Sequence, residues 1–440
     1  MGALVQRIRR SFDEPMHRTS SSLIASTLVT GALGFPFWAI AARTSTPEEV
    51  GRASALIVAS AVVSRICLLN LDNVVIRFLP QLSSAIGIRI VQSYFATAAI
   101  SALGALVFVL VVPELSQEFT FLREDQLLAA GFVVFTSLWS LFVLEDAVLV
   151  ALGRAVWVPL ENGFFGVAKI LLLPLTAVMA ASTGIFLAWM APILVIVPVI
   201  ALLIGRIALP TAAEAQKDAA GVVSTFGWKG LSAYLFQDFF GSLSGQIITM
   251  SLPVLVIALL GSADAAYFYV PFTLVIAFDG LFYAVASSLT VEAVRDTARV
   301  DELTRLAVRR MLIVQLPAAA AIIVAAPLLL LPFGSDYVDN GTTLLRLLAL
   351  GSVFRATLFL FDATARLQGA GARLMTVRIM NLALLLALMI PLSESHGVNG
   401  VGWSWAIANG VAAIVVLPYV IAFVRHPKVR AAAIVDPVTP

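Results

Sequence analysis

Uninterrupted apolar runs of about 20 residues recur along the whole of this 440-residue chain. A helix of that length is about 30 Å long, which matches the hydrocarbon thickness of a bilayer. Hydrophobic residues make up 60% of the chain and charged residues 12%, and a water-soluble fold cannot bury that much apolar surface. A transmembrane barrel is excluded because its strands alternate apolar and polar residues. The sequence therefore predicts an all-α polytopic membrane protein.

The apolar runs predict about twelve transmembrane helices. We expect the first to be a retained helix and not a signal peptide, because the stretch Leu23–Ala42 is too long and further spans follow. The predicted spans are residues 20–42, 53–78, 90–112, 126–150, 160–181, 184–205, 230–260, 267–290, 310–332, 342–365, 374–392 and 399–424.

The distribution of basic residues predicts the orientation of the chain. If the N-terminus is cytoplasmic, 21 of the 28 Lys and Arg residues fall in cytoplasmic segments or at cytoplasmic helix ends. Four fall in outer segments and three within spans. Because cytoplasmic loops of membrane proteins are enriched in Lys and Arg, we expect both termini in the cytoplasm and an even number of spans.

The two halves of the chain resemble each other at a fixed spacing, which indicates an internal repeat. Five residue pairs lie 216 or 217 positions apart: Glu48 and Asp264, Asp146 and Asp362, Gly153 and Gly369, Pro36 and Pro253, and Pro174 and Pro391. We expect two parallel six-helix halves around a central cavity. The predicted organisation is a cytoplasmic segment 1–19, a first half 20–205, a cytoplasmic linker 206–229, a second half 230–424 and a cytoplasmic tail 425–440.

Motifs for catalysis and cofactor binding are absent from the sequence. It contains no phosphate-binding G-x-x-x-x-G-K-[ST] loop, no HExxH and no GxSxG, so we expect neither an ATPase nor another enzyme. The single cysteine, Cys67, and three widely separated histidines predict no metal site and no cofactor. The net charge of +2 gives no indication of nucleic-acid binding. Any energy source is then an ion gradient, the membrane potential or the supply of substrate.

Charged residues inside the predicted spans are the candidate functional residues, because such charges are costly in a membrane. Two arginine–aspartate pairs lie seven residues apart on one helix face, about 10 Å along the axis, which is too far for a tight ion pair. The candidates for substrate binding in the cavity are Arg65, Arg355, Lys169, Asp72 and Asp362, and those for ion coupling are Asp238 and Asp279. The alternative is that these charges form ion pairs between helices or extend to the membrane surface.

The first two spans resemble a known family. They contain a glycine–aromatic stretch, an AAR…TPEEVG turn and an RFLP ending, although Asn70 and Asp72 make the LNLDN segment more polar than the family pattern. This is similar to the Wzx-type flippases of O-antigen and related repeat units, in the multidrug/oligosaccharidyl-lipid/polysaccharide exporter superfamily. The matching residues are Gly34, Phe35, Trp38, Ala42, Arg43, Glu48, Glu49, Val50, Gly51, Arg77, Phe78, Leu79 and Pro80.

The resemblance implies a transporter in the bacterial cytoplasmic membrane. Its substrate would be a polyprenyl-pyrophosphate-linked oligosaccharide for cell-surface polysaccharide synthesis, and its partners the bilayer and other polysaccharide-assembly membrane proteins. Two alternatives remain open at this point. One is a drug or organic-cation antiporter of the same superfamily, which would use Asp238 or Asp279. The other is a membrane glycan polymerase or ligase, which the short outer connectors disfavour.

Overall fold

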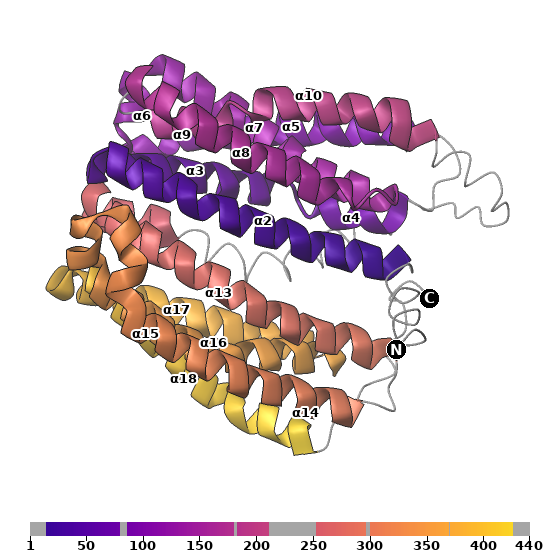
Figure 1. Ribbon diagram of the computed structural model, residues 1–440, viewed down its shortest axis with the longest axis vertical. Helices are drawn as coiled ribbons and strands as arrows, with labels where there is room; N and C mark the ends of the chain where they lie inside the picture. Colours follow the sequence, from indigo (N-terminus) through magenta and orange to yellow (C-terminus); the bar gives the residue numbers. More distant parts are fainter. Residues whose placement is uncertain are drawn as a thin grey trace, which may run out of the picture. The chain divides into compact units, whose positions relative to one another are not determined.

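The computed structural model describes residues 15–79, 86–179, 183–210, 252–295, 300–368 and 370–425. Within these ranges the chain is helical, with short turns and no strands. The chain divides into two compact units, Met1–Leu243 and Ser244–Pro440. Within each unit the long helices run side by side along a common direction (Figure 1). The predicted all-helical polytopic class is therefore confirmed.

The N-terminal unit is built from long helices joined by short helical segments. Its elements are α2 (Pro15–Thr44), α3 (Pro47–Cys67), α4 (Leu71–Phe78), α5 (Ile86–Leu115), η2 (Gln117–Phe119), α6 (Phe121–Glu124), α7 (Gln126–Ala151), α8 (Trp157–Met179), α9 (Gly184–Met190), α10 (Ile193–Leu203) and the π-helical η3 (Ile204–Ala208). Helix α2 packs on α8, and α7 packs on α3, α4, α5 and α10.

Local sequence signals explain where α3 and α7 begin. The Thr46 side chain accepts a hydrogen bond from the Glu49 backbone N–H, and the Glu49 carboxylate accepts one from the Thr46 backbone N–H. This reciprocal capping box precedes Pro47, whose fixed φ suits the first helical position. Asp125 caps α7 in a similar way by accepting from the N–H groups of Leu127 and Leu128.

The second predicted span, residues 53–78, is not one continuous helix. Helix α3 ends at Cys67 and α4 begins at Leu71, and between them Leu69 and Asn70 adopt positive φ values of 49° and 64°. These left-handed residues cannot continue a right-handed helix, and asparagine tolerates that conformation better than most residues. The continuous-span prediction was wrong because the apolar pattern carries no signal for this break.

The C-terminal unit is built from longer continuous helices. Its elements are α13 (Ser262–Arg295), α14 (Val300–Arg310), the π-helical η5 (Met311–Gln315), α15 (Leu316–Leu330), η6 (Leu331–Phe333), α16 (Ser335–Leu367), α17 (Gly371–His396) and α18 (Val398–Arg425). Helix α16 packs against α13, α15 and α18. A further helical stretch occupies residues 252–260.

Ten helices in the described ranges are long and apolar enough to cross a membrane. Each overlaps one of the predicted spans. Of the other two predicted spans, residues 230–260 lie mostly outside the described ranges. Residues 267–290 fall within α13, a helix of 34 residues. The sixth predicted span is interrupted at Pro192, between α9 and α10.

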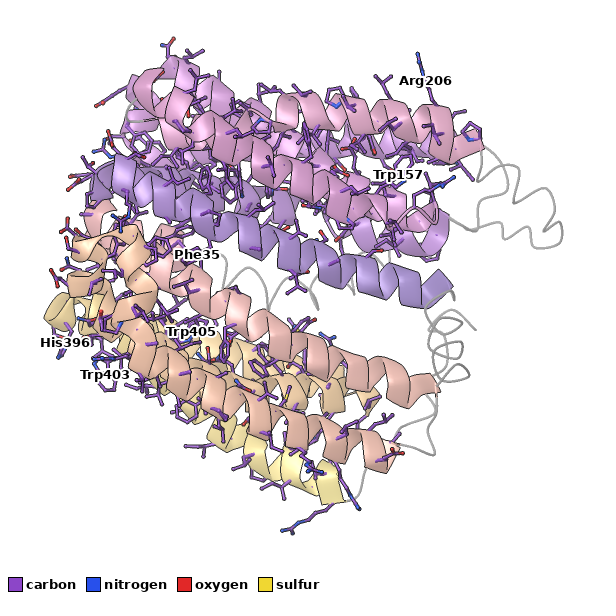
Figure 2. The ribbon with its side chains drawn as sticks, in the orientation of Figure 1. Phe35, Trp157, Arg206, His396, Trp403 and Trp405 are labelled. Carbon is purple, nitrogen blue, oxygen red and sulfur yellow. The ribbon has the colours of Figure 1, made fainter. Side chains whose placement is uncertain are left out.

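Glycine allows a close helix contact between α16 and α18 in the C-terminal unit. A Cβ atom added to Gly351 of α16 would lie 2.3 Å from Cδ1 of Trp405 in α18. The absent side chain therefore lets the indole pack directly on the backbone of α16. Trp405 is fully buried, whereas Trp403, two residues earlier, is exposed, and Figure 2 shows the two on different sides of α18.

Candidate functional site

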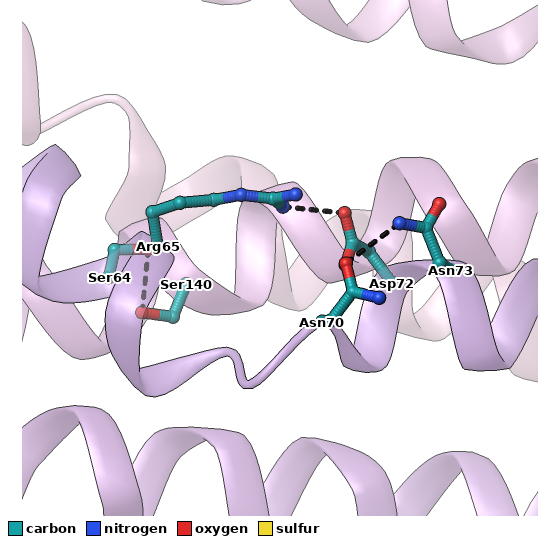
Figure 3. Close-up of polar contacts among 6 residues, drawn as sticks. All are labelled: Ser64, Arg65, Asn70, Asp72, Asn73 and Ser140. Carbon is teal, nitrogen blue, oxygen red and sulfur yellow. Dashed lines mark hydrogen bonds and ion pairs between the residues drawn. The ribbon is translucent and has the colours of Figure 1, made fainter. Parts of the chain in front are cut away.

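Arg65 and Asp72 meet across the break between α3 and α4. Arg65 Nη1 lies 2.6 Å from Asp72 Oδ2, and the side chains are 18% and 17% exposed. Figure 3 shows both side chains extending toward each other past the non-helical turn at Asn70. The expected separation of these two residues was wrong because it assumed one straight helix. The Asn73 side-chain amide also donates to Asn70 Oδ1, which links the turn to the first residues of α4.

Lys169 is buried in a cage of aromatic rings in the N-terminal unit. Its Nζ lies 3.4 Å from the ring centroid of Trp189, 4.9 Å from that of Phe165 and 5.3 Å from that of Phe37. The side chain is only 1% exposed. Within the described ranges no carboxylate lies within ion-pair distance of it. The ring faces are the main compensation for the ammonium charge here.

Close packing of α8 on α2 creates this cage. A Cβ atom on Gly166 would lie 2.5 Å from the side chain of Leu33, so the two helices approach each other where Gly166 has no side chain. Phe37 is one turn further along α2 and is fully buried. The Phe37 and Trp189 rings meet edge to face at a centroid distance of 5.1 Å, which fixes the walls around Lys169.

An acidic group lies on α7 and α8, two turns along α8 from Lys169. Glu145 and Glu161 are 0% and 4% exposed, and their carboxylate oxygens have no hydrogen-bond partner within the described ranges. Glu161 and Asp146 are both close enough to Glu145 for their charges to interact. Asp146 is the member that has a polar partner, since the Asn162 side-chain amide lies 3.4 Å from both of its carboxylate oxygens.

Arg355 in the C-terminal unit is paired with a carboxylate on another helix. Its Nε lies 2.8 Å from Asp279 Oδ2 of α13, and the Asp279 side chain is only 3% exposed. The guanidinium carbon also lies 4.7 Å from the ring centroid of Trp405 and 5.3 Å from that of Phe359. Two candidates assigned to different roles, substrate binding and ion coupling, therefore form one ion pair that is stacked on aromatic rings.

Asp362 is not paired with Arg355, and the distance of about 10 Å along α16 predicts this. Its Oδ2 instead accepts a hydrogen bond from Arg378 Nη2 of α17 at 2.9 Å. The remaining ion-coupling candidate, Asp238, lies outside the described residues. Arg378 was not among the candidates, and no position within α16 could have indicated a partner on the next helix.

Contacts that recur in both units follow the 216-residue spacing. Asp146 contacts Asn162, and 216 residues later Asp362 contacts Arg378. Trp189 and Trp405 are also 216 residues apart, and each lies against a cation, the buried Lys169 in one case and the partly exposed Arg355 in the other. The sequence repeat thus extends to side-chain contacts. Trp189 and Asn162 were not among the candidates, although the 216-residue spacing relates Trp189 to Trp405 and Asn162 to Arg378.

Within the described ranges, no group of three or more His, Cys, Asp or Glu side chains is placed to hold a metal ion. The residues brought together are instead cations on aromatic rings and carboxylates in dry surroundings. Such an arrangement can compensate an anionic group or exchange a small cation, because each requires an opposite charge in a medium of low dielectric constant.

Several solved structures have folds similar to that of this chain. No family model matches the chain, and no curated protein matches it. An inward-facing multidrug resistance MATE family transporter of the MOP superfamily aligns with a TM-score of 0.64 and 16% identity, over 91% of this chain and 96% of that one. An outward-facing MATE transporter aligns with a TM-score of 0.62 and 15% identity, over 94% and 97% of the two chains.

A third similar structure is a MOP superfamily transporter from Pyrococcus furiosus. It aligns with a TM-score of 0.57 and 15% identity, over 93% of this chain and 94% of that one. That protein is described as having a binding pocket of reverse polarity that suggests a different function. At these identities the alignments establish the fold alone. The chain is a polytopic helical membrane protein with a MATE-like fold.

Proposed function

We propose that this protein is a transporter that moves a polyprenyl-pyrophosphate-linked oligosaccharide across the bacterial cytoplasmic membrane for cell-surface polysaccharide synthesis. The fold supports the transporter class, since the similar structures are transporters of the MOP superfamily. The motifs of the first two spans support the substrate, because they resemble those of Wzx-type flippases. The proposed orientation has both termini in the cytoplasm.

The observation that carries the choice of substrate is Lys169. It is a fully buried cation near the middle of a membrane-spanning helix, without a carboxylate partner in the described ranges. Cation–π contacts contribute about 2 kcal/mol or more when desolvated. An ion pair with a phosphate oxygen is a charge-assisted hydrogen bond and stronger still. In the described ranges Lys169 therefore has no carboxylate that a pyrophosphate would need to displace, whereas Arg65 and Arg355 already contact carboxylates.

The aromatic residues around Lys169 suit the remainder of such a head group. Sugar rings present apolar C–H faces, which pack on tryptophan and phenylalanine rings. Trp189 and Phe165 lie against the lysine in one cluster, so a phosphate and an adjoining sugar could be held together. The arrangement is less suited to an organic cation, which the ammonium group would repel.

The test is transport by purified protein in lipid vesicles that contain a labelled lipid-linked oligosaccharide. We expect Lys169→Met to reduce the transport rate at least tenfold while thermal stability stays close to wild type, because methionine fills the same apolar space. Lys169→Arg should retain part of the activity, since it keeps the charge. The matched control is Leu171→Met, at an exposed position of the same helix outside the cage, which should leave transport unchanged. Unchanged transport by Lys169→Met would disprove the proposed substrate site.

The acidic group of Glu145, Asp146 and Glu161 favours a second candidate, an organic-cation antiporter. Two buried carboxylates without partners can attract a cation or a proton. The same vesicles distinguish the two functions. An antiporter would accumulate a labelled organic cation against an imposed proton or sodium gradient, and it would lose this activity in Glu145→Gln. A glycan transporter would move the oligosaccharide lipid and show no such accumulation.

A further inference from the structure

The C-terminal unit has an apolar groove that is separate from the residues of the candidate site. It encloses about 420 Å³ between the α14–α15 segment, α16 and α18, a size within the 300–1,000 Å³ usual for small-molecule sites. Most of its lining is aliphatic, and Phe354 is its aromatic member. Leu417 and Ile421 of α18, both more than 40% exposed, form its open edge.

The groove has one cationic end. Arg425, the last residue of α18, lines it and is exposed. Arg305 of α14 lies one turn before Val308, another lining residue, and shares its face of the helix. Glu302 lies one turn further from the groove than Arg305, so the charge nearest the groove mouth is positive.

The opposite end of the groove is closed by a polar contact. Gln315, at the end of the π-helical segment η5, is 2% exposed and donates from Nε2 to the Ser352 carbonyl oxygen at 2.7 Å. Its Oε1 atom has no hydrogen-bond partner within the described ranges. This contact ties η5 to α16 and forms the floor of the groove.

The dimensions of the groove match one membrane leaflet. Arg425 and Leu417 are eight residues apart on α18, and Val308 and Leu316 are eight apart on the neighbouring segment, about 12 Å along each axis. A leaflet has a hydrocarbon depth of about 15 Å. A chain that starts at the cationic end would therefore lie along the groove at the depth of a lipid tail.

We infer that this groove binds the isoprenoid chain of a polyprenyl phosphate, with the phosphate at Arg425 and Arg305. The charge at the mouth is complementary to a phosphate, and the apolar walls are complementary to a hydrocarbon. One groove accommodates one chain, and polyprenyl phosphates are single-chain lipids, whereas membrane phospholipids have two adjacent chains. The identity of the lipid rests on the proposed function, because it is the carrier part of the proposed substrate.

Photo-crosslinking tests this site in purified protein in nanodiscs of zwitterionic phospholipid. A photoactivatable residue at Ile421, on the groove edge, should label radioactive undecaprenyl phosphate. The same residue at Ile414, which is 70% exposed on α18 outside the groove, should label it at least tenfold less. Unlabelled undecaprenyl phosphate should compete at least tenfold better than a two-chain phosphatidic acid. Equal competition would overturn the inference in favour of bulk phospholipid.

Groove-filling variants give the second arm. Ala356→Phe should lower labelling from Ile421 at least tenfold, while Ala320→Phe, at an exposed alanine of α15 outside the groove, should not change it. If Ala356→Phe does not fold, Leu417→Trp fills the same groove from its exposed edge. Arg425→Gln should lower labelling about threefold. Arg346→Gln, in α16 outside the groove, should leave it unchanged. Unchanged labelling in a folded groove-filling variant overturns the site.

The probe separates this inference from the proposed function because it carries no glycan. Labelling that meets these expectations in a protein that moves no oligosaccharide would leave the groove assigned and the proposed function wrong. Oligosaccharide transport without groove labelling would support the proposed function and overturn the assignment of the groove.

Discussion

Two pairs of helices that the internal repeat relates, α3 with α7 and α13 with α16, are joined by different side-chain contacts in the two units. In the N-terminal unit, Thr136 and Ser140 of α7 donate to Ser60 and Ser64 of α3, at 3.2 and 2.9 Å. The repeat relates α7 to α16 and α3 to α13, and there the contact is the ion pair of Arg355 with Asp279. All three contacts join residues 76 positions apart. The helices therefore keep one register while the interface changes from hydroxyl groups to charges.

The two kinds of contact differ in the free energy of unfolding that is lost when one partner is removed. A hydroxyl pair in a membrane contributes about 0.6 kcal/mol on average and leaves no charge behind when it is lost. A buried ion pair adds little net stability, but removing one partner costs about 3–5 kcal/mol because the other charge stays buried. The C-terminal unit is therefore the one in which a single substitution at this interface should have a large effect.

The largest expected effect is from Asp279→Ala. It leaves Arg355, whose side chain is only 17% exposed, without its carboxylate, so we expect a loss of about 3–5 kcal/mol in the free energy of unfolding. Thermal unfolding of the purified protein in detergent would measure it. The double variant Asp279→Ala with Arg355→Gln removes both charges and should recover more than half of the loss. Additive effects of the two single changes would show that the two residues are not coupled.

The next effect is from Gly351→Ala, which tests how α16 receives Trp405. The new Cβ would clash with the indole, and overpacking of this kind costs about 1–3 kcal/mol. Displacement of Trp405 should also weaken its stacking under Arg355. The matched control is Gly31→Ala in α2, which has open space around its Cβ position and should be stabilising by about 0.5–1 kcal/mol. A neutral Gly351→Ala in the same thermal assay would contradict this packing.

A smaller effect is expected at the hydroxyl interface. Ser140→Ala removes the donor to Ser64 and should cost about 1 kcal/mol, because the partner hydroxyl can turn to a backbone carbonyl. Ser64→Ala together with Ser140→Ala should cost little more than either alone. If Ser140→Ala proved as destabilising as Asp279→Ala, the contrast between the two interfaces would fail.

Sequence reasoning recovered the helices better than their contacts, and the physical reason is the range of each signal. Apolar run length is local, so ten spans could be placed from it. The break at Asn70 depends on two residues in a left-handed conformation inside an apolar pattern, and the pattern does not record it. The partners of Arg355 and Asp362 lie on other helices, so neither pairing follows from spacing on α16.

The smallest effect is expected from Asn162→Arg, which gives the N-terminal unit the residue type that the C-terminal unit has at the related position. Asn162 of α8 and Arg378 of α17 are related by the repeat, and each contacts the related aspartate, Asp146 or Asp362. Asn162→Arg should convert a long contact of 3.4 Å into a charge-assisted one like that of Arg378. Because partly exposed ion pairs contribute about 0.2–1 kcal/mol, we expect a gain of about 0.5 kcal/mol in thermal unfolding. Arg378→Asn should give a loss of similar size. A large loss in Asn162→Arg would show that the added cation disturbs Glu145 and Glu161, and that the acidic group of the N-terminal unit depends on remaining without a fixed counter-charge.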